Sequence, residues 1–223
     1  MLDEAEAVHM KLLDFNQTRR AMTLIDVLIV IATLALLVTV VLFGGLLRPR
    51  RSSRIGCVNN LKQVGLAFRM WGNDHGDKFP WQVAAKDGGT LEFSNTVQVW
   101  RHFDIASNEM NSPRILTCPY DAQRSKTNVW PIGNQNISYF IGVDADETRP
   151  NSILSGDRNL STNNSVLSGV VTFRTAAKAR WTTAIHKNLG IIALADGSAQ
   201  EVSGRSLFQC ITNAGLPLRL SIP

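Results

Sequence analysis

The sequence has few of the residue patterns on which small-site chemistry depends. Its three cysteines form neither a Cys-x-x-Cys pair nor a zinc-ligand pattern, and its four histidines are scattered without metal spacing. It contains no G-x-S-x-G motif, no P-loop and no paired histidine–carboxylate constellation. We therefore expect no enzyme, no catalytic residue and no required cofactor.

Charge is also sparse. Charged residues make up 18% of the chain and hydrophobic residues 44%, which fits a globular domain plus a membrane segment and excludes a disordered chain. The net charge of +5 comes from dispersed lysines and arginines, so we expect no nucleic-acid partner. From Val27 to Leu47 there is no charged residue at all. At about 1.5 Å per residue, a helix over this run is long enough to cross the roughly 30 Å core of a bilayer.

The start of the apolar run carries an acid that a plain membrane anchor does not need. Asp26 lies just inside the run, where a carboxylate costs free energy unless it finds a partner. The basic pair Arg19–Arg20 stands directly before a small residue, Ala21. The run is too long for the roughly 7–15 apolar residues of a secretory signal, and no A-x-A-like site follows it.

This opening resembles the prepilin cleavage and methylation signal of type IV pilins and type II secretion pseudopilins. That signal has basic residues, then Gly, then Phe-Thr-Leu-Ile-Glu and a long apolar helix, and Thr23–Ile25 matches it directly. The resemblance implies that Ala21 replaces the Gly before the scissile bond and that Met22 becomes the N-methylated first residue. It also implies that Asp26 replaces the Glu. These three positions are where the chain departs from the pattern.

The resemblance also implies partners and a location. The partners are a prepilin peptidase, other pilin or pseudopilin subunits met through the N-terminal helix, and membrane lipid around that helix. Pairing the new amine of Met22 with Asp26 would neutralise both charges in lipid and set the register of packing helices. The implied location is the inner membrane, crossed once, with a cytoplasmic N-terminus and a periplasmic head. The arginines on both sides of the span do not decide this orientation.

Motifs further along resemble a group of pilin-like proteins abundant in planctomycetes and verrucomicrobia. That group has Cys-x-Asn-Asn-Leu-Lys-Gln after the anchor helix, then Cys-Pro-x-Asp, then a hairpin with His, nine residues and Asp-Gly. The matching residues here are Cys57, Asn59, Asn60, Cys118, Pro119, Asp121, His186, Asp196 and Gly197. Residues 138–150 and 155–159 also read like that group. The resemblance implies structural roles for these motif residues.

We therefore expect an α+β fold, in which a long N-terminal helix, membrane-spanning in its first half, packs on a small antiparallel β-sheet head as in pilins. The expected parts are a leader peptide over 1–21, a transmembrane assembly helix over 22–47, an amphipathic continuation over 48–72 and a β-rich extracytoplasmic head over 73–223. Within the leader, Met10 is a better start than Met1, whose acidic surroundings are unusual before a membrane segment.

The continuation is expected to bury one face. Its apolar residues recur at spacings of three and four, which predicts a buried stripe formed by Ile55, Val58, Leu61, Val64 and Phe68. Upstream, two glycines and a proline at 44, 45 and 49 predict a bend.

In the head, short β-branched and aromatic runs predict strands at 97–103, 115–118, 137–143 and 170–173. Segments 182–185 and 191–194 predict a hairpin, and Asp196–Gly197 predicts a second turn before a strand at 199–202. Residues 206–212 predict a short terminal helix, and residues 144–168 predict a long polar loop.

Three features of the head allow more than one interpretation. Outside the cytoplasm two cysteines are expected to pair and leave one over, and we favour Cys57 with Cys118, although spacing does not fix connectivity. We expect His186 to hydrogen-bond within the hairpin that Asp196–Gly197 closes, in preference to binding or catalysis. An acidic group offers the oxygen ligands that Ca²⁺ prefers, although salt bridges in a solvated loop explain it more simply. Its members are Asp144, Asp146, Glu147 and Asp157.

These observations favour a structural subunit of a type IV pilus-like or type II secretion pseudopilus filament. One alternative is a monomeric, single-pass, membrane-anchored binding domain exposed to the periplasm, and another is a secreted domain that keeps an uncleaved anchor. Asp26 separates these classes, because an assembling helix needs it and an anchor does not. Secretion, adhesion, DNA uptake and motility all stay open, as does the choice between a major and a minor subunit.

Overall fold

The structure is a computed structural model that describes residues 22–46, 51–163, 165–176 and 179–223. The chain divides into two compact units, Met1–Pro49 and Arg50–Pro223, and each is treated separately here. Its mixture of helices and antiparallel sheet agrees with the expected α+β class. The expected leader, with Ala21, and the expected bend near Pro49 lie outside the described residues.

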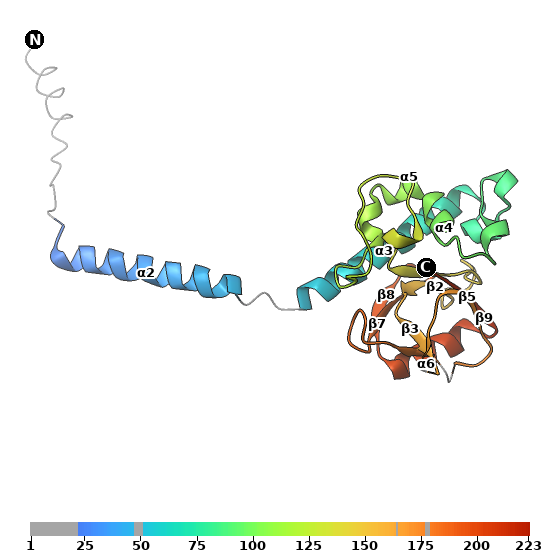
Figure 1. Ribbon diagram of the computed structural model, residues 1–223. Helices are drawn as coiled ribbons and strands as arrows, with labels where there is room; N and C mark the ends of the chain where they lie inside the picture. The colour runs from blue at the N-terminus through green and yellow to red at the C-terminus, as the bar shows by residue number, and fades with distance from the viewer. Residues whose placement is uncertain (1–21, 47–50, 164, 177–178) are drawn as a thin grey trace, which may run out of the picture. The chain divides into compact units, whose positions relative to one another are not determined.

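The first unit contains α2 (Leu24–Leu46), drawn in blue in Figure 1. In the described part of the chain, α2 is the one helix long and apolar enough to cross a membrane, over Leu24–Val41. A signal sequence near the N-terminus would meet the same criterion of length and composition. The side chains from Met22 to Val41 are all exposed, so no described residue of the first unit covers the apolar surface of α2.

The second unit is organised around α3 (Arg51–Asp74), whose buried face follows a helical repeat. Its buried residues at alternating spacings of four and three are Cys57, Leu61, Val64, Phe68 and Trp71. Ile55 was expected on this face and is 59% exposed. The expectation was wrong at this end because Ile55 lies about 240° around the helix from Leu61, at 100° per residue.

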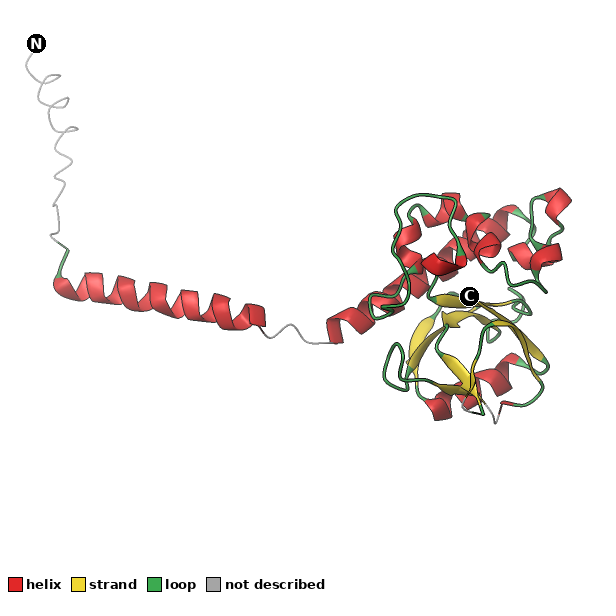
Figure 2. Cartoon of the chain, viewed as in Figure 1, coloured by secondary structure: helices red, strands yellow, loops and turns green. Residues whose placement is uncertain are grey.

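A six-stranded antiparallel sheet forms the centre of the second unit, in the order β5-β9-β1-β2-β7-β8. The strands are β1 (Tyr139–Gly142), β2 (Ile153–Asp157), β5 (Gly169–Phe173), β7 (Gly190–Leu194), β8 (Ala199–Val202) and β9 (Leu218–Ile222). Figure 2 shows these strands in yellow, curving together between helices. The expected strands at 137–143, 170–173, 191–194 and 199–202 are confirmed within a few residues.

Both faces of this sheet are buried. In β7, Ile191 and Ala193 face the core under α3, whereas Ile192 faces a second core. Helix α6 (Gly204–Ala214) covers that second core through Leu207 and Ile211. Figure 1 shows α3, α4 and α5 on one side of the strands and α6 on the other. The expected helix at 206–212 is confirmed, although β9 follows it and pairs with β1 and β5.

Between α3 and β1 the described chain is helical and irregular, and the two strands expected there are wrong. The segment 97–103 overlaps α4 (Trp100–Asp104), which is followed by α5 (Ser107–Met110). Buried residues at positions 99, 103, 106 and 110 recur at the three- and four-residue spacings of a helix. The segment 97–103 is too short to show this repeat, and its aromatic residues favoured a strand. The short 3-10 helices are η1 (Pro80–Gln82), η2 (Ala85–Asp87), η3 (Leu91–Phe93), η4 (Pro113–Leu116) and η5 (Asn134–Asn136).

Helix η4 replaces the strand expected at 115–118, and its start signal is visible locally. Pro113 occupies the first turn, where its missing N–H costs nothing, and the Ser112 hydroxyl accepts a hydrogen bond from Arg114 N at 3.4 Å.

The long loop expected at 144–168 is also wrong, because it contains β2, β3 (Leu160–Thr162) and β4 (Ser165–Val166). In β2, Ser155 is buried and its hydroxyl donates to Phe140 O at 2.7 Å. Gly156 lies against the Phe140 ring, where no Cβ would fit. The small residues Ser155 and Gly156 therefore fit a strand that is buried on both faces.

The hairpin expected across residues 187–190 is wrong as well. The strand before that turn is β6 (Ala179–Trp181), which pairs with β3 in a separate three-stranded sheet of order β4-β3-β6. Strand β7 pairs instead with β2 and β8. Residues 182–189 cross from one sheet to the other, and this crossing carries His186.

Candidate functional site

The first candidate region is the start of α2. Asp26 Oδ2 accepts hydrogen bonds from Thr23 N at 3.0 Å and Thr23 Oγ1 at 2.9 Å. Asp26 N in turn lies 3.3 Å from Thr23 Oγ1. Thr23 is therefore the N-cap and Asp26 the third residue of a reciprocal capping box. Asp26 thus has a structural role within its own helix, so its presence alone does not distinguish an assembling helix from a plain membrane anchor. Met22 is exposed beside it.

The second candidate region lies in the head, where motifs far apart in the sequence meet. Cys57 of α3 forms a disulfide with Cys118, as expected, and Cys210 of α6 stays free. The Cys-Pro-x-Asp motif is a turn closed by Asp121 N donating to Cys118 O at 2.9 Å. Cys118 N also donates to Ser138 Oγ at 3.0 Å, which ties the turn to the start of β1.

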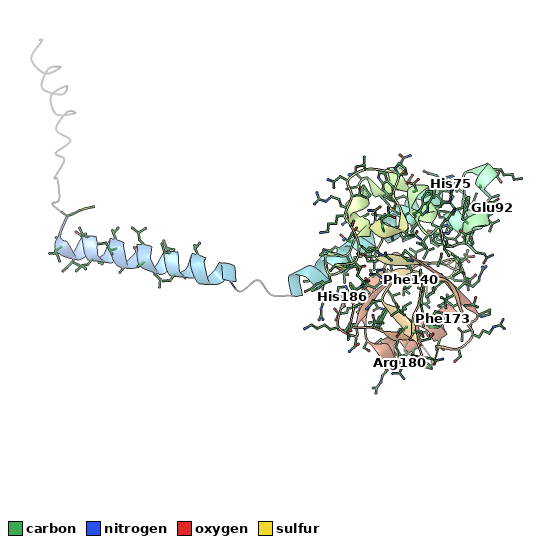
Figure 3. All side chains as sticks on the ribbon, in the orientation of Figure 1. His75, Glu92, Phe140, Phe173, Arg180 and His186 are labelled. Carbon is green, nitrogen blue, oxygen red and sulfur yellow. A yellow bond between two sulfur atoms is a disulfide. The ribbon has the colours of Figure 1, made fainter. Side chains whose placement is uncertain are left out.

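His186 lies at this disulfide, beside the N-terminal half of α3 (Figure 3). Its Nε2 is 3.4 Å from Cys118 Sγ and 3.4 Å from Asp157 Oδ2, and its ring meets the Tyr120 ring edge-on at 5.1 Å. The expectation of hydrogen bonds within the Asp196–Gly197 hairpin was wrong. That hairpin joins β7 to β8, whereas His186 precedes it on the crossing between the two sheets.

Asp157, at the end of β2, is the buried carboxyl of this cluster. Its Oδ2 accepts a hydrogen bond from Ile191 N at 2.7 Å. Burial raises the pKa of Asp157 to about 8, with the neighbouring Asp121 carboxylate acting in the same direction. Burial also lowers the pKa of His186 to about 4, helped by the positive charge of Arg54. At neutral pH both groups are uncharged, so their contact is not an ion pair.

The other motif residues form the surrounding frame. Arg158 donates to both Asp121 oxygens at 2.7 and 2.8 Å, and this ion pair holds the pKa of Asp121 below its usual range against the effect of burial. Asn60 is half-buried near the Tyr139 hydroxyl, and Asn59 is exposed. Pro119 lies inside the Cys118–Asp121 turn.

Asp196 and Gly197 form the β7–β8 turn, away from His186. Gly197 has a φ of +85°, which favours glycine, and Asp196 Oδ1 accepts from Ser198 N at 2.8 Å. Arg69 of α3 donates to Asp196 O at 2.9 Å. The expected turn is confirmed, and its contact with α3 gives it a structural role.

The acids considered for Ca²⁺ have separate partners. Asp144 pairs with Arg219 at 2.5 Å, Glu147 pairs with Arg69 at 3.0 Å, and Asp146 accepts from Thr148 Oγ1 at 2.6 Å. Asp157 lies in the buried cluster described above. Calcium binding stays a prediction.

The pattern of the sequence did not reveal the cluster of Cys57, Cys118 and His186. Cys57 and Cys118 are 61 residues apart, and His186 follows Cys118 by 68, so no local spacing joins them. Only the order of the motifs suggested that they belong together.

Comparisons of the chain with protein-family models, with curated proteins and with solved structures find no match.

Proposed function

We propose that this chain is a structural subunit of a type IV pilus-like or type II secretion pseudopilus filament. A prepilin peptidase would cut it between Ala21 and Met22, and its N-terminal helix would pack against those of other subunits. The observation that carries the proposal is the Arg-Arg-Ala-Met-Thr-Leu-Ile-Asp sequence of residues 19–26, whose last three residues begin α2. The capping box begins at Thr23, one residue beyond the proposed new N-terminus.

The surface of α2 supports this proposal. Every side chain from Met22 to Val41 is exposed, and apart from Thr23, Asp26 and two threonines the run is apolar. Thr33 and Thr39 donate their hydroxyl hydrogens to Val30 O at 2.9 Å and Leu36 O at 2.7 Å within the helix. No polar group of the middle of α2 therefore needs a partner outside it, and both lipid and like helices can cover it.

Cross-linking through α2 tests assembly. In a Cys210→Ser background, Thr33→Cys or Thr39→Cys places one thiol on the helix, while Cys57 and Cys118 remain bonded to each other. Oxidation of native membranes should give disulfide-linked dimers from at least one of these two positions. A chain that stays monomeric at both positions, under conditions that cross-link a known filament subunit, contradicts the proposal.

The alternative of an anchored binding domain has one observation in its favour. An open hollow of about 480 Å³ lies over η3 and α4, and its lining includes Phe93, Trp100 and Arg101. The Arg101 guanidinium lies 4.3 Å from the Phe93 ring centroid and 4.6 Å from that of Trp100. A cation held between two rings suits an anionic ligand. Absence of cross-linking through α2 would make this alternative the leading function.

A further inference from the structure

Two polar side chains, His186 and Asp157, are buried beside the Cys57–Cys118 disulfide, which does not need them to form. In the described part of the chain, Cys57, Cys118 and His186 are the one group of three or more His, Cys, Asp or Glu side chains placed to hold a metal ion. Their ligand atoms all lie within 4.8 Å of one another, and all three residues are buried.

His186 and Asp157 are polar and buried beside this disulfide, and His186 Nε2 lies 3.4 Å from both Cys118 Sγ and Asp157 Oδ2. Buried polar atoms are nearly always paired, because leaving one unpaired costs about 1–3 kcal/mol. A disulfide is at best a weak acceptor, so it gives little reason to bury an imidazole and a carboxyl beside it.

We propose that, when the Cys57–Cys118 disulfide is reduced, the two thiolates and His186 Nε2 bind a thiophilic divalent cation, Zn²⁺ first among them, with Asp157 beside the imidazole as an outer contact. This inference concerns the head alone and does not depend on the proposed filament function.

The distances are close to those of a zinc site with two sulfur ligands and one nitrogen ligand. Zinc bonds of about 2.3 Å to sulfur and 2.0–2.1 Å to nitrogen give ligand-to-ligand distances of about 3.5–3.8 Å. His186 Nε2 already lies 3.4 Å from Cys118 Sγ, and the three ligand atoms all lie within 4.8 Å of one another. The Cα atoms of Cys57 and Cys118 are 5.4 Å apart, so parting of the sulfurs after reduction is the main movement needed.

The surroundings fit a metal ligand set. Asp157 Oδ2 lies 3.4 Å from His186 Nε2 and is itself held by a hydrogen bond from Ile191 N at 2.7 Å, so a fixed carboxyl group stands beside the imidazole as an outer contact of the site. The Tyr120 ring holds the imidazole in place edge-on.

The redox step balances with a dithiol reductant. The reductant gives two electrons and two protons, the S–S bond breaks into two thiols, and the reductant becomes a disulfide. Zn²⁺ then displaces the two thiol protons to solvent and forms two Zn–S bonds and one bond to His186 Nε2. The disulfide and the metal are therefore mutually exclusive states of one site.

Cobalt spectroscopy of the full-length chain in detergent tests this inference. The chain is reduced with a phosphine without oxygen, freed of reductant and titrated with Co²⁺, which reports thiolate ligation by charge-transfer bands and tetrahedral geometry by its visible bands. We expect about one Co²⁺ per reduced chain, displaced by Zn²⁺, and none for the oxidised chain. Near-ultraviolet circular dichroism follows the fold of the head throughout.

Matched variants separate this site from other thiols. Cys210→Ser removes the third cysteine, which lies in α6 outside the cluster, and should leave the titration unchanged. Cys57→Ser and His186→Gln should abolish the one-to-one complex, and Asp157→Asn should weaken it about 10–100-fold. The oxidised His186→Gln chain keeps its disulfide, so its unfolding curve shows whether the substitution itself disturbs the fold.

Three results would overturn the inference. The first is a folded, reduced wild-type chain that binds no Co²⁺, and the second is full affinity in His186→Gln. The third is loss of binding in Cys210→Ser. A reduced head that loses its near-ultraviolet signal and does not regain it with Zn²⁺ also counts against the site.

Discussion

Asp26 and Thr23 form a reciprocal pair at the first turn of α2, with Asp26 Oδ2 2.9 Å from Thr23 Oγ1 and 3.0 Å from Thr23 N. A carboxylate at this place satisfies N–H groups that the helix leaves unpaired and faces the positive end of the helix dipole. Asp26 therefore has two candidate roles, one within its own helix and one between subunits, and these roles predict different outcomes for different substitutions.

Substitutions at this pair should separate the two roles. In the Thr33→Cys, Cys210→Ser background, Thr23→Ala removes the capping hydroxyl at a cost of about 1 kcal/mol but leaves the carboxylate. We expect Thr23→Ala to keep cross-linking through α2 and Asp26→Asn to lose it, because only the second removes the charge that pairs with the Met22 amine. Equal cross-linking in both variants, measured on non-reducing gels, would assign Asp26 to the cap alone.

The Cys57–Cys118 disulfide should be a major source of stability in the head. It closes a loop across a sequence separation of 61, for which the chain-entropy model gives about 4 kcal/mol. We expect the Cys57→Ala, Cys118→Ala double variant to lose roughly 2–5 kcal/mol in urea unfolding without added metal. Cys210→Ala is the control, and a loss of similar size there would show that the disulfide is not the cause.

His102 should contribute a loss of head stability in mild acid. This side chain is fully buried, its Nδ1 lies 2.7 Å from Thr90 Oγ1, and its ring meets the Trp81 ring edge-on. Burial lowers the pKa of His102 from 6.5 to about 4, partly offset by a hydrogen bond to Phe93. Between these values the unfolded chain binds a proton that the folded chain excludes, so stability falls as the pH is lowered from about 6.5 to about 4.

The His102 contribution is on the order of 3 kcal/mol over this window. Urea unfolding at a series of pH values should therefore show a shallower dependence for His102→Asn than for the unchanged chain. His186 adds a slope of the same sign and Asp157, whose pKa is raised to about 8, adds one of opposite sign, and both proteins share these two contributions. Parallel curves for the two proteins would mean that His102 does not titrate in this way.

Two glycines should respond oppositely to alanine. A Cβ on Gly142 of β1 would fall on the carbonyl oxygen of Ile153 in the paired strand, a backbone atom that cannot move aside cheaply. Gly142→Ala should cost about 1–3 kcal/mol or more. A Cβ on Gly56 in α3 meets nothing within 4 Å, so Gly56→Ala should gain about 0.5–1 kcal/mol from helix propensity. Thermal unfolding that ranks the two variants in the reverse order would contradict this packing.

The sequence predicted the parts of the fold that have a clear period or a clear turn. The stripe from Leu61 to Phe68 and the turn at Asp196–Gly197 were both found. It failed where tertiary packing overrode local composition. Four buried positions between 99 and 110 repeat every three or four residues along α4 and α5, where a strand was expected, and the buried strand β2 contains a serine and a glycine in a sheet covered on both faces.

The two candidate sites also differ in how much of each could be predicted from the sequence. The start of α2 was identified because its signal is contiguous, whereas its capping box went unnoticed although Thr-x-x-Asp is visible in the sequence. The Cys57, Cys118 and His186 cluster depends on three segments that only the fold brings together, and residues 182–185, expected as a hairpin strand beside 191–194, instead belong to the crossing between the two sheets.

Mass spectrometry of the N-terminal peptide, taken from membranes of the native host, tests the central claim most directly. The account predicts a peptide that begins at N-methylated Met22. A peptide that retains residues before Met22, with no trace of cleavage after Ala21, would contradict prepilin processing and favour the anchored binding domain.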